Sequence, residues 1–148
     1  FTALLVLLWQ PLPTVIWDLS GTAVGDALVV TYVLGWLIVL YATFLINHFH
    51  LFGLQQTFGR LTERELKDAS FITPSLYKLV RHPMMLGVLI ALWSIPTLTV
   101  GRLLLSAGLT VYIWIALRLE ERTLVAELGE QYLTYQKSTP MVIPFTRP

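Results

Sequence analysis

The polar side chains best suited to chemistry gather in three short stretches of the sequence, each next to a long apolar run. Imidazole, guanidinium, phenol and carboxylate groups are all present, so the stretches combine proton donors and acceptors with charges of both signs. Titratable groups of this kind beside apolar helices indicate a binding or catalytic site. The stretches comprise Asn47, His48 and His50; Tyr77, Lys78, Arg81 and His82; and Arg118, Glu120, Glu121 and Arg122.

Glu121 lies on the apolar face that the sequence predicts for a C-terminal helix over residues 118–136. Apolar and aromatic side chains recur there three and four positions apart, which is the spacing of one helical face. A carboxylate on that face needs a hydrogen bond or an ion pair, because burying it alone is costly. We expect its partner to be Arg118 or Arg122 on the same helix, or a bound ligand. The members of this face are Leu117, Glu121, Leu124, Leu128, Tyr132 and Tyr135.

Some of the neighbouring residues have simple structural explanations. Pro83 suits the first turn of a helix, and basic residues just before it are ordinary at the edge of a membrane span. Met84 and Met85 suit apolar packing. His48 and His50 lie two positions apart with no Cys and no adjacent carboxylate, so we predict no metal site.

The elements that must position these groups are predicted to be membrane helices. The chain has 148 residues, of which 55% are hydrophobic and only 13% charged, whereas a soluble domain carries about 25% charged residues. Residues 27–46 are twenty residues without a charge, and as a helix they would be roughly 30 Å long, which matches a bilayer core. Two more uncharged runs, residues 84–100 and 103–117, are separated only by Gly101 and Arg102, so we expect a tight helical hairpin.

Residues 1–9 are a fourth apolar run, which is too short to span and stops at Pro11 and Pro13. No Met precedes this run, and it shows neither a basic region nor a small-residue cleavage site of the kind a signal peptide needs. We therefore expect residues 1–148 to be one membrane domain whose first helices lie upstream of the sequence.

The distribution of Lys and Arg predicts the orientation. The segment 47–83 and the tail after residue 117 together hold nine of them, against Arg102 alone on the other side. The positive-inside rule places the loop and tail in the cytoplasm, together with all three polar stretches. The net charge of +1 gives no broad basic surface, so we predict no nucleic-acid partner.

The fold class predicted from these features is all-α, a polytopic membrane helical bundle. A cytoplasmic cap is expected from the loop before Arg81 and from the C-terminal amphipathic helix. Residues 62–70 can form a short surface helix in that loop, since Thr62 and Glu65 make a capping box. Pro140, Pro144 and Pro148 should end regular structure in the tail.

The order and spacing of several motifs resemble those of the integral-membrane methyltransferases, which include isoprenylcysteine carboxyl methyltransferases and phospholipid N-methyltransferases. The family pattern is RHPxYxG, then EExxL, then GxxYxxY, and the resemblance covers about half of the chain, from Tyr77 to Pro144. Any single piece is unspecific, but the ordered set is specific. The matching residues are Arg81, His82, Pro83, Gly87, Glu120, Glu121, Leu124, Gly129, Tyr132 and Tyr135.

Within that superfamily, the chain more closely resembles the methanethiol S-methyltransferase family. The resemblance rests on segments 11–18 (PLPTVIWD), 44–54 (FLINHFHLFGL) and 96–101 (PTLTVG). That family methylates methanethiol with S-adenosylmethionine and makes dimethyl sulfide, and its members are longer at the N-terminus. The chain departs from the family at Met85, where Tyr is usual, and at His50, where an acidic residue is more common.

The resemblance implies S-adenosylmethionine as methyl donor, S-adenosylhomocysteine as product, and no metal. Arg81 would pair with the donor's carboxylate, Gly87 would allow close approach, and Glu121, more than Glu120, would hold the ribose hydroxyls or the ammonium group. Thiol deprotonation would fall to His48 or His82, because histidine titrates near neutral pH. The expected cofactor-binding residues are Tyr77, Arg81, His82, Pro83, Gly87, Glu120, Glu121, Tyr132 and Tyr135; the catalytic ones His48, His82 and Arg81; and the substrate-pocket ones Asn47, His48, His50 and Met85.

The expected partners are a small thiol substrate and the lipid bilayer, and the expected location is a bacterial inner membrane with the active site on its cytoplasmic face. Two alternatives stay open: methylation of a prenylcysteine carboxylate or a phospholipid amine, and a catalytically silent membrane subunit. A transporter is disfavoured, since no charged residue lies mid-span and no inverted repeat is evident. The sequence makes no prediction of oligomeric state.

Overall fold

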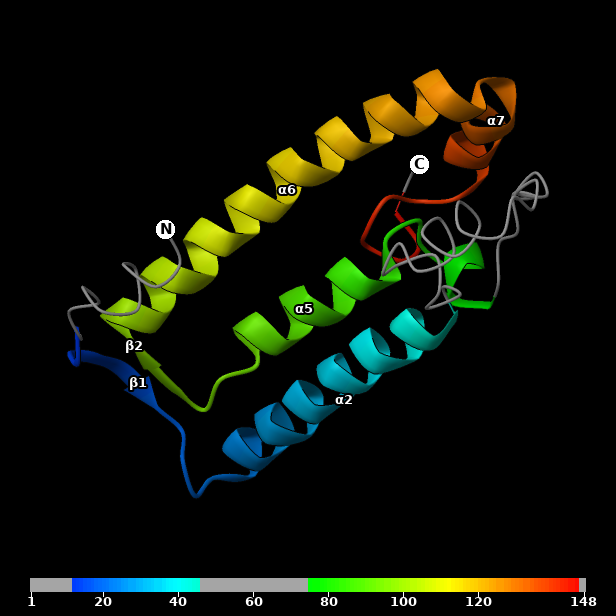
Figure 1. Cartoon of the computed structure of the whole chain (residues 1–148). Coiled ribbons are helices and arrows are strands. Elements are labelled where there is room, and N and C mark those ends of the chain that lie inside the picture. The colour runs from blue at the N-terminus through cyan, green and yellow to red at the C-terminus, as the bar shows by residue number, and fades with distance from the viewer. Residues whose placement is uncertain (1–11, 46–74, 147–148) are drawn as a thin grey trace, which may run out of the picture.

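The computed structural model describes residues 12–45 and 75–146, and its long helices run alongside one another (Figure 1). The described part confirms the predicted all-α class and adds one small antiparallel sheet. In chain order the elements are β1 (Val15–Asp18), α2 (Ala23–Leu45), η1 (Ser75–Lys78), α5 (Pro83–Trp93), β2 (Thr97–Thr99), α6 (Val100–Leu128) and α7 (Glu130–Ser138).

Helices α2 and α6 are long and apolar enough to cross a membrane, at 23 and 29 residues. The most apolar windows of the two helices are only 11% and 22% buried inside the protein, and side chains such as Val30, Leu37 and Leu104 are exposed. The core helix of a soluble protein would be mostly buried, whereas a membrane helix presents apolar side chains to lipid. The chain is therefore a membrane protein.

Helices α2 and α5 lie side by side because two glycines meet between them (Figure 1). A Cβ on Gly87 would lie 2.6 Å from the carbonyl oxygen of Gly35, and a Cβ on Gly35 would lie 2.8 Å from that of Gly87. Small residues at such a crossing let the two backbones approach closely, as they do in many membrane helix pairs.

The predicted hairpin boundaries are wrong. Helix α5 ends at Trp93 rather than at residue 100, and the connection is the segment 94–99, which carries strand β2. Pro96 cannot continue a helix, and strand β2 pairs with β1, with Asp18 opposite Thr97. Arg102 consequently lies in the first turn of α6, where its amide N donates to Thr99 Oγ1 at 3.3 Å.

The predicted continuous C-terminal helix is also interrupted. Helix α6 runs to Leu128, Gly129 adopts a φ of 56°, and α7 begins at Glu130. A positive φ is available to glycine without a Cβ clash, so the chain turns there. Helix α7 then ends at Ser138, and Pro140 and Pro144 follow in irregular structure as expected. The predicted helix at residues 62–70 and the apolar run 1–9 lie outside the described residues.

The apolar core joins α5, α6 and the C-terminal segment. It is centred on Ile113, Leu117 and Val142, with side chains of α5 packed against it. Val142 is 2% exposed, so the segment after α7 is fixed against the two helices. This packing places the C-terminal segment next to α5 and the middle of α6.

Candidate functional site

A buried ion pair lies at the end of the bundle where α5 begins. Arg81 Nε donates to Glu121 Oε1 at 2.6 Å, and Arg81 Nη2 donates to Glu121 Oε2 at 3.0 Å. The two side chains are only 7% and 11% exposed. Glu121 therefore has the buried partner that its place on the apolar face requires, but that partner is Arg81 rather than Arg118 or Arg122. A bidentate guanidinium–carboxylate pair is strong and geometrically specific.

The rest of the Arg81 guanidinium binds the backbone near the end of α7. Its Nη1 donates to the carbonyl oxygens of Gln136, at 3.0 Å, and Thr139, at 2.5 Å. Four of the five N–H donors that a guanidinium carries are thus engaged within the protein. Through these hydrogen bonds Arg81 connects the loop that precedes α5 with α6 and with the end of α7.

Backbone hydrogen bonds fix the same loop to the C-terminal segment. The amide nitrogens of Arg81 and His82 donate to the carbonyl oxygens of Pro140 and Met141, at 2.9 and 3.0 Å. Pro83 is buried and is the first residue of α5, as predicted. Proline is tolerated there because its missing N–H would have no helical partner.

Glu121 accepts further hydrogen bonds from three other side chains. The distances are 3.2 Å from His82 Nε2, 3.4 Å from Tyr132 Oη and 3.1 Å from Gln136 Nε2. An ionised carboxylate only accepts hydrogen bonds, so His82 carries a proton on Nε2. His82 Nδ1 faces Glu120 at 3.9 Å, and the Glu120 side chain is 55% exposed.

Three tyrosines lie beside this ion pair, and the hydroxyls of two of them, Tyr132 and Tyr135, donate hydrogen bonds. Tyr135 Oη donates to the carbonyl oxygen of Tyr77, and the rings of Tyr132 and Tyr135 meet edge-on, with centroids 5.9 Å apart. Burial raises the pKa of Tyr77 and of Tyr135 to about 12. Burial, followed by the charge of Glu121, raises the pKa of Tyr132 as well. The structure therefore brings together Tyr77, Arg81, His82, Glu121, Tyr132 and Tyr135, all of them predicted site residues.

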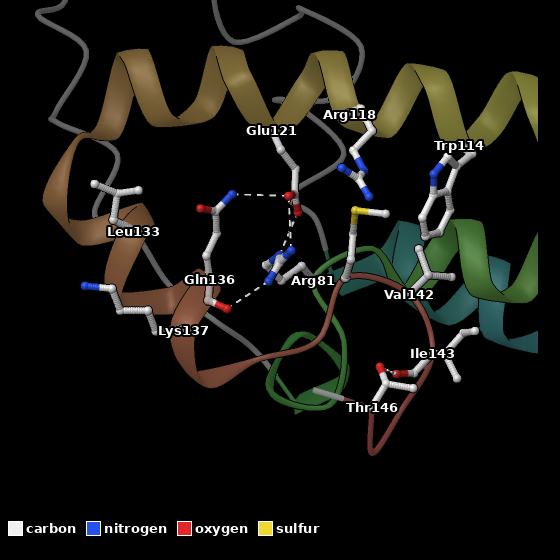
Figure 2. A pocket seen from close by; sticks show the side chains of 11 residues that line it. Arg81, Trp114, Arg118, Glu121, Leu133, Gln136, Lys137, Val142, Ile143 and Thr146 are labelled. Atoms are coloured by element: carbon white, nitrogen blue, oxygen red, sulfur yellow. Dashed lines mark hydrogen bonds and ion pairs between the residues drawn. The ribbon is translucent and has the colours of Figure 1, made fainter. Parts of the chain in front are cut away.

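A cavity of about 860 Å³ opens beside this network (Figure 2). Its volume falls within the usual range for small-molecule sites. From the predicted set, Arg81 and Glu121 line it. Arg118, from the third polar stretch of the sequence, also lines it but had no predicted role; the other lining residues were not predicted: Trp114, Leu133, Gln136, Lys137, Met141, Val142, Ile143 and Thr146.

Trp114 and Arg118 extend the helical face that carries Glu121. They precede Glu121 by seven and three positions, so all three side chains lie on the same side of α6. Continuing the predicted face toward the N-terminus would have found Trp114, and Arg118 already lies within the predicted helix. The lining residues 141–146 lie in irregular structure, for which periodicity gives no signal.

Two predicted site residues lie in apolar contacts outside this polar network. Gly87 faces Gly35 of α2, which occupies the space where a Cβ would stand. Met85 packs against the core around Leu117. Asn47, His48 and His50 lie outside the described residues. Across residues 12–45 and 75–146, no group of three or more His, Cys, Asp or Glu side chains is arranged to hold a metal ion.

Comparison with known proteins confirms the resemblance to methanethiol S-methyltransferases. The chain is 48% identical over 143 residues to methanethiol S-methyltransferase 2 of Bradyrhizobium diazoefficiens, covering 95% of this chain and 55% of that protein. It is 45% identical over 145 residues to methanethiol S-methyltransferase of Mycobacterium tuberculosis, covering 97% of this chain and 59% of the relative. The chain thus spans between half and two thirds of the length of these relatives.

A weaker similarity links the chain to nurim of Sus scrofa, at 30% identity over 126 residues, 78% of this chain and 47% of that protein. No protein-family model matches the chain, and no solved structure matches it.

Proposed function

We propose that this protein transfers the methyl group of S-adenosylmethionine to methanethiol and makes dimethyl sulfide. The observation that carries the proposal is the similarity to proteins named methanethiol S-methyltransferase, which extends along 95% of the chain at 48% identity. The cavity beside the Arg81–Glu121 pair is the proposed donor site, since two of the matched motif residues, Arg81 and Glu121, line it.

The side chains of this cavity suit such a donor. S-adenosylmethionine combines an aromatic base, a sulfonium and a zwitterionic amino-acid end, so its site needs aromatic surface and both signs of charge. The cavity offers the Trp114 ring, the Arg118 and Lys137 cations and the Glu121 carboxylate. When bound, the donor supplies an electrophilic methyl group on sulfur, and that sulfur keeps the electron pair as the carbon–sulfur bond breaks.

The ion pair at the centre of the network serves to hold the wall of the cavity. Arg81 was predicted to bind the donor's carboxylate, but its charge is already paired with Glu121 at 2.6 Å. Together they connect the loop before α5, helix α6, and the end of α7. A site fixed in this way can keep the methyl group in line with the attacking sulfur, which is the main requirement for transfer.

His82 is the candidate proton acceptor among the described residues. Its Nε2 is committed to Glu121, so Nδ1 is the nitrogen that can accept the thiol proton. Glu120, at 3.9 Å from Nδ1, would stabilise the resulting imidazolium and is exposed enough to pass the proton to water. His48, which lies outside the described residues, is the alternative base.

The site is proposed to face the cytoplasm of a bacterial inner membrane. Lys78, Arg118, Arg122 and Lys137 lie in the elements that surround this end of the bundle, whereas Arg102 lies in the first turn of α6 at the other end. That asymmetry is the one the positive-inside rule requires. A water-poor site at the membrane face would favour this reaction, because a cationic sulfonium and an anionic thiolate neutralise each other as the methyl moves.

The test is dimethyl sulfide production by the purified full-length protein. Protein in detergent is mixed with S-adenosylmethionine and methanethiol, the headspace is analysed, and donor binding is measured in parallel by calorimetry. The proposal expects donor-dependent dimethyl sulfide. Donor binding without turnover would favour a prenylcysteine carboxylate or a phospholipid amine as acceptor, and a folded protein that binds no donor would be a silent membrane subunit.

A further inference from the structure

Arg118 is a cation of the cavity wall that the ion-pair network does not use. Within the described residues Arg118 takes part in no ion pair, whereas Arg81 is neutralised by Glu121. Figure 2 shows Arg118 projecting from α6 into the same space as Glu121 and Trp114. An Arg that extends into a cavity without a carboxylate partner is suited to bind an anionic ligand group.

The contact between Arg118 and Trp114 orients the guanidinium. Its central carbon lies over the Trp114 ring, 5.2 Å from the ring centroid. A guanidinium that lies over an aromatic ring makes no conventional hydrogen bond to that ring, so its N–H groups stay available to a ligand. Those N–H groups can form two parallel hydrogen bonds to a carboxylate.

The other cations of the wall are less well placed. Arg81 has four of its five side-chain N–H groups committed. The nitrogen of Lys137 points away from Arg81 and Arg118 (Figure 2). Among the described residues, Arg118 is therefore the cation of this wall that has no ion-pair partner, lies over an aromatic ring and projects into the cavity.

We propose that Arg118 binds the carboxylate of the methyl donor's amino-acid end, and this assignment rests on the proposed function. Arg81 and Arg118 then have different roles: the ion pair of Arg81 with Glu121 stabilises the cavity wall, and Arg118 binds the ligand. The position of Arg118, three residues before Glu121, also places the cation and the carboxylate of the wall one helical turn apart.

The test compares two ligands that differ only in the carboxylate: S-adenosylhomocysteine and its decarboxylated form. Affinities are measured by calorimetry on the full-length protein in detergent, for wild type, Arg118→Gln, Arg118→Lys and Arg122→Gln. Arg122 is the matched control, because it is an exposed Arg on the same helix that does not line the cavity. Since Arg118 is exposed as well, both glutamine variants should fold, and thermal unfolding checks this.

The expected result is that Arg118→Gln weakens S-adenosylhomocysteine binding roughly tenfold or more and leaves the decarboxylated ligand unaffected. Arg118→Lys should restore part of the loss, and Arg122→Gln should bind both ligands as the wild type does. The assignment is overturned if Arg118→Gln leaves both affinities unchanged or lowers both equally. If the folded wild-type protein binds neither ligand, the proposed function itself fails, and the assignment fails with it.

Discussion

Asp18 and Glu121 are both hydrogen-bonded carboxylates, and they lie at opposite ends of the helical bundle. Asp18 accepts hydrogen bonds from the backbone amide of Ser20 and from Thr97 Oγ1, both at 2.9 Å, in an exposed turn beside the small sheet. Glu121 is 8% exposed and accepts from Arg81 and from three other side chains. The comparison shows that hydrogen bonding alone does not make a site: burial and an opposite charge distinguish Glu121.

The two carboxylates also differ in what they join. Asp18 connects the end of β1 with β2, which is its immediate neighbour in the sheet. Glu121 connects α6 with the loop before α5 and with α7. The structural effect of removing the Asp18 carboxylate should therefore be confined to the sheet, whereas removing the Glu121 carboxylate should change the whole cavity wall.

Replacing Glu121 should have the largest effect. Glu121→Gln keeps the size of the side chain but leaves the Arg81 charge buried without a counter-ion, which costs about 3–5 kcal/mol when one partner of such a pair is removed. We expect a much lower midpoint of thermal unfolding in detergent and loss of S-adenosylhomocysteine binding. Arg122→Gln, on an exposed position of α6, is the control. A Glu121→Gln protein as stable as the wild type would contradict the account of the ion pair.

A substitution at Gly87 tests the contact between α2 and α5, which lies between the sheet end and the site end of the bundle. Gly87→Val would place side-chain atoms against the backbone of Gly35, where even a Cβ would be 2.6 Å from an oxygen, and overpacking of this kind costs about 1–3 kcal/mol. Thermal unfolding in detergent should show that loss. Gly108→Ala is the matched control, because nothing lies within 4 Å of its Cβ position. Equal unfolding midpoints for the two variants would show that the α2–α5 contact is not close.

Replacing Tyr135 should cause a smaller loss of stability at the end of the bundle that carries the site. Tyr135→Phe removes the hydrogen bond to the carbonyl oxygen of Tyr77, and one such bond contributes about 0.5–1.5 kcal/mol. The unfolding midpoint should fall slightly at neutral pH, where the raised pKa of about 12 keeps the wild-type phenol protonated. As pH rises above about 10, the phenol ionises in the unfolded wild-type protein before it does so in the folded one, so the stability difference between the two proteins should shrink and be lost as pH passes about 12. A difference that persists beyond pH 12 would contradict the hydrogen-bond explanation.

Asp18 should give the smallest effect, confined to low pH. Hydrogen bonds from Ser20 and Thr97 lower the pKa of Asp18 below its ordinary value of 3.8. Their contribution is complete above that value and is lost as pH falls through the lowered pKa, when the carboxylate becomes protonated. The amide resonance of Ser20, followed by NMR, should shift only below pH 3.8 and should lose this transition in Asp18→Asn. A transition near neutral pH would show that Asp18 is not the group involved.

The sequence predicted the burial of Glu121 but not its partner. The three-and-four spacing is local, so it identified the apolar face and the demand for a counter-charge. Arg81 lies 40 positions away, and only the tertiary packing of α5 against α6 brings the two together. The neighbouring Arg118 and Arg122 were reasonable local candidates, yet the structure directs Arg118 into the cavity instead.

The sequence did not predict the β1–β2 sheet for the same reason: the pairing joins residues that are far apart in the chain. Residues 84–100 form one uncharged apolar run, and hydropathy does not distinguish a buried helix from a short buried strand. Thr97 is paired with Asp18, 79 positions earlier. The break at Gly129 was missed for a different reason: Tyr132 still reaches Glu121 after the turn, so the periodic pattern continued across a change of helix.

The most direct test of the central claim is hydrogen–deuterium exchange of the full-length protein with and without S-adenosylhomocysteine. The amides of Arg81 and His82 are bonded to the C-terminal segment, and their exchange reports on the cavity wall. The account predicts slower exchange on ligand addition in the loop before α5, the second half of α6, α7 and residues 139–146, with no change in β1 or β2. Protection at the sheet end alone, or no protection anywhere in a protein that binds the ligand, would contradict it.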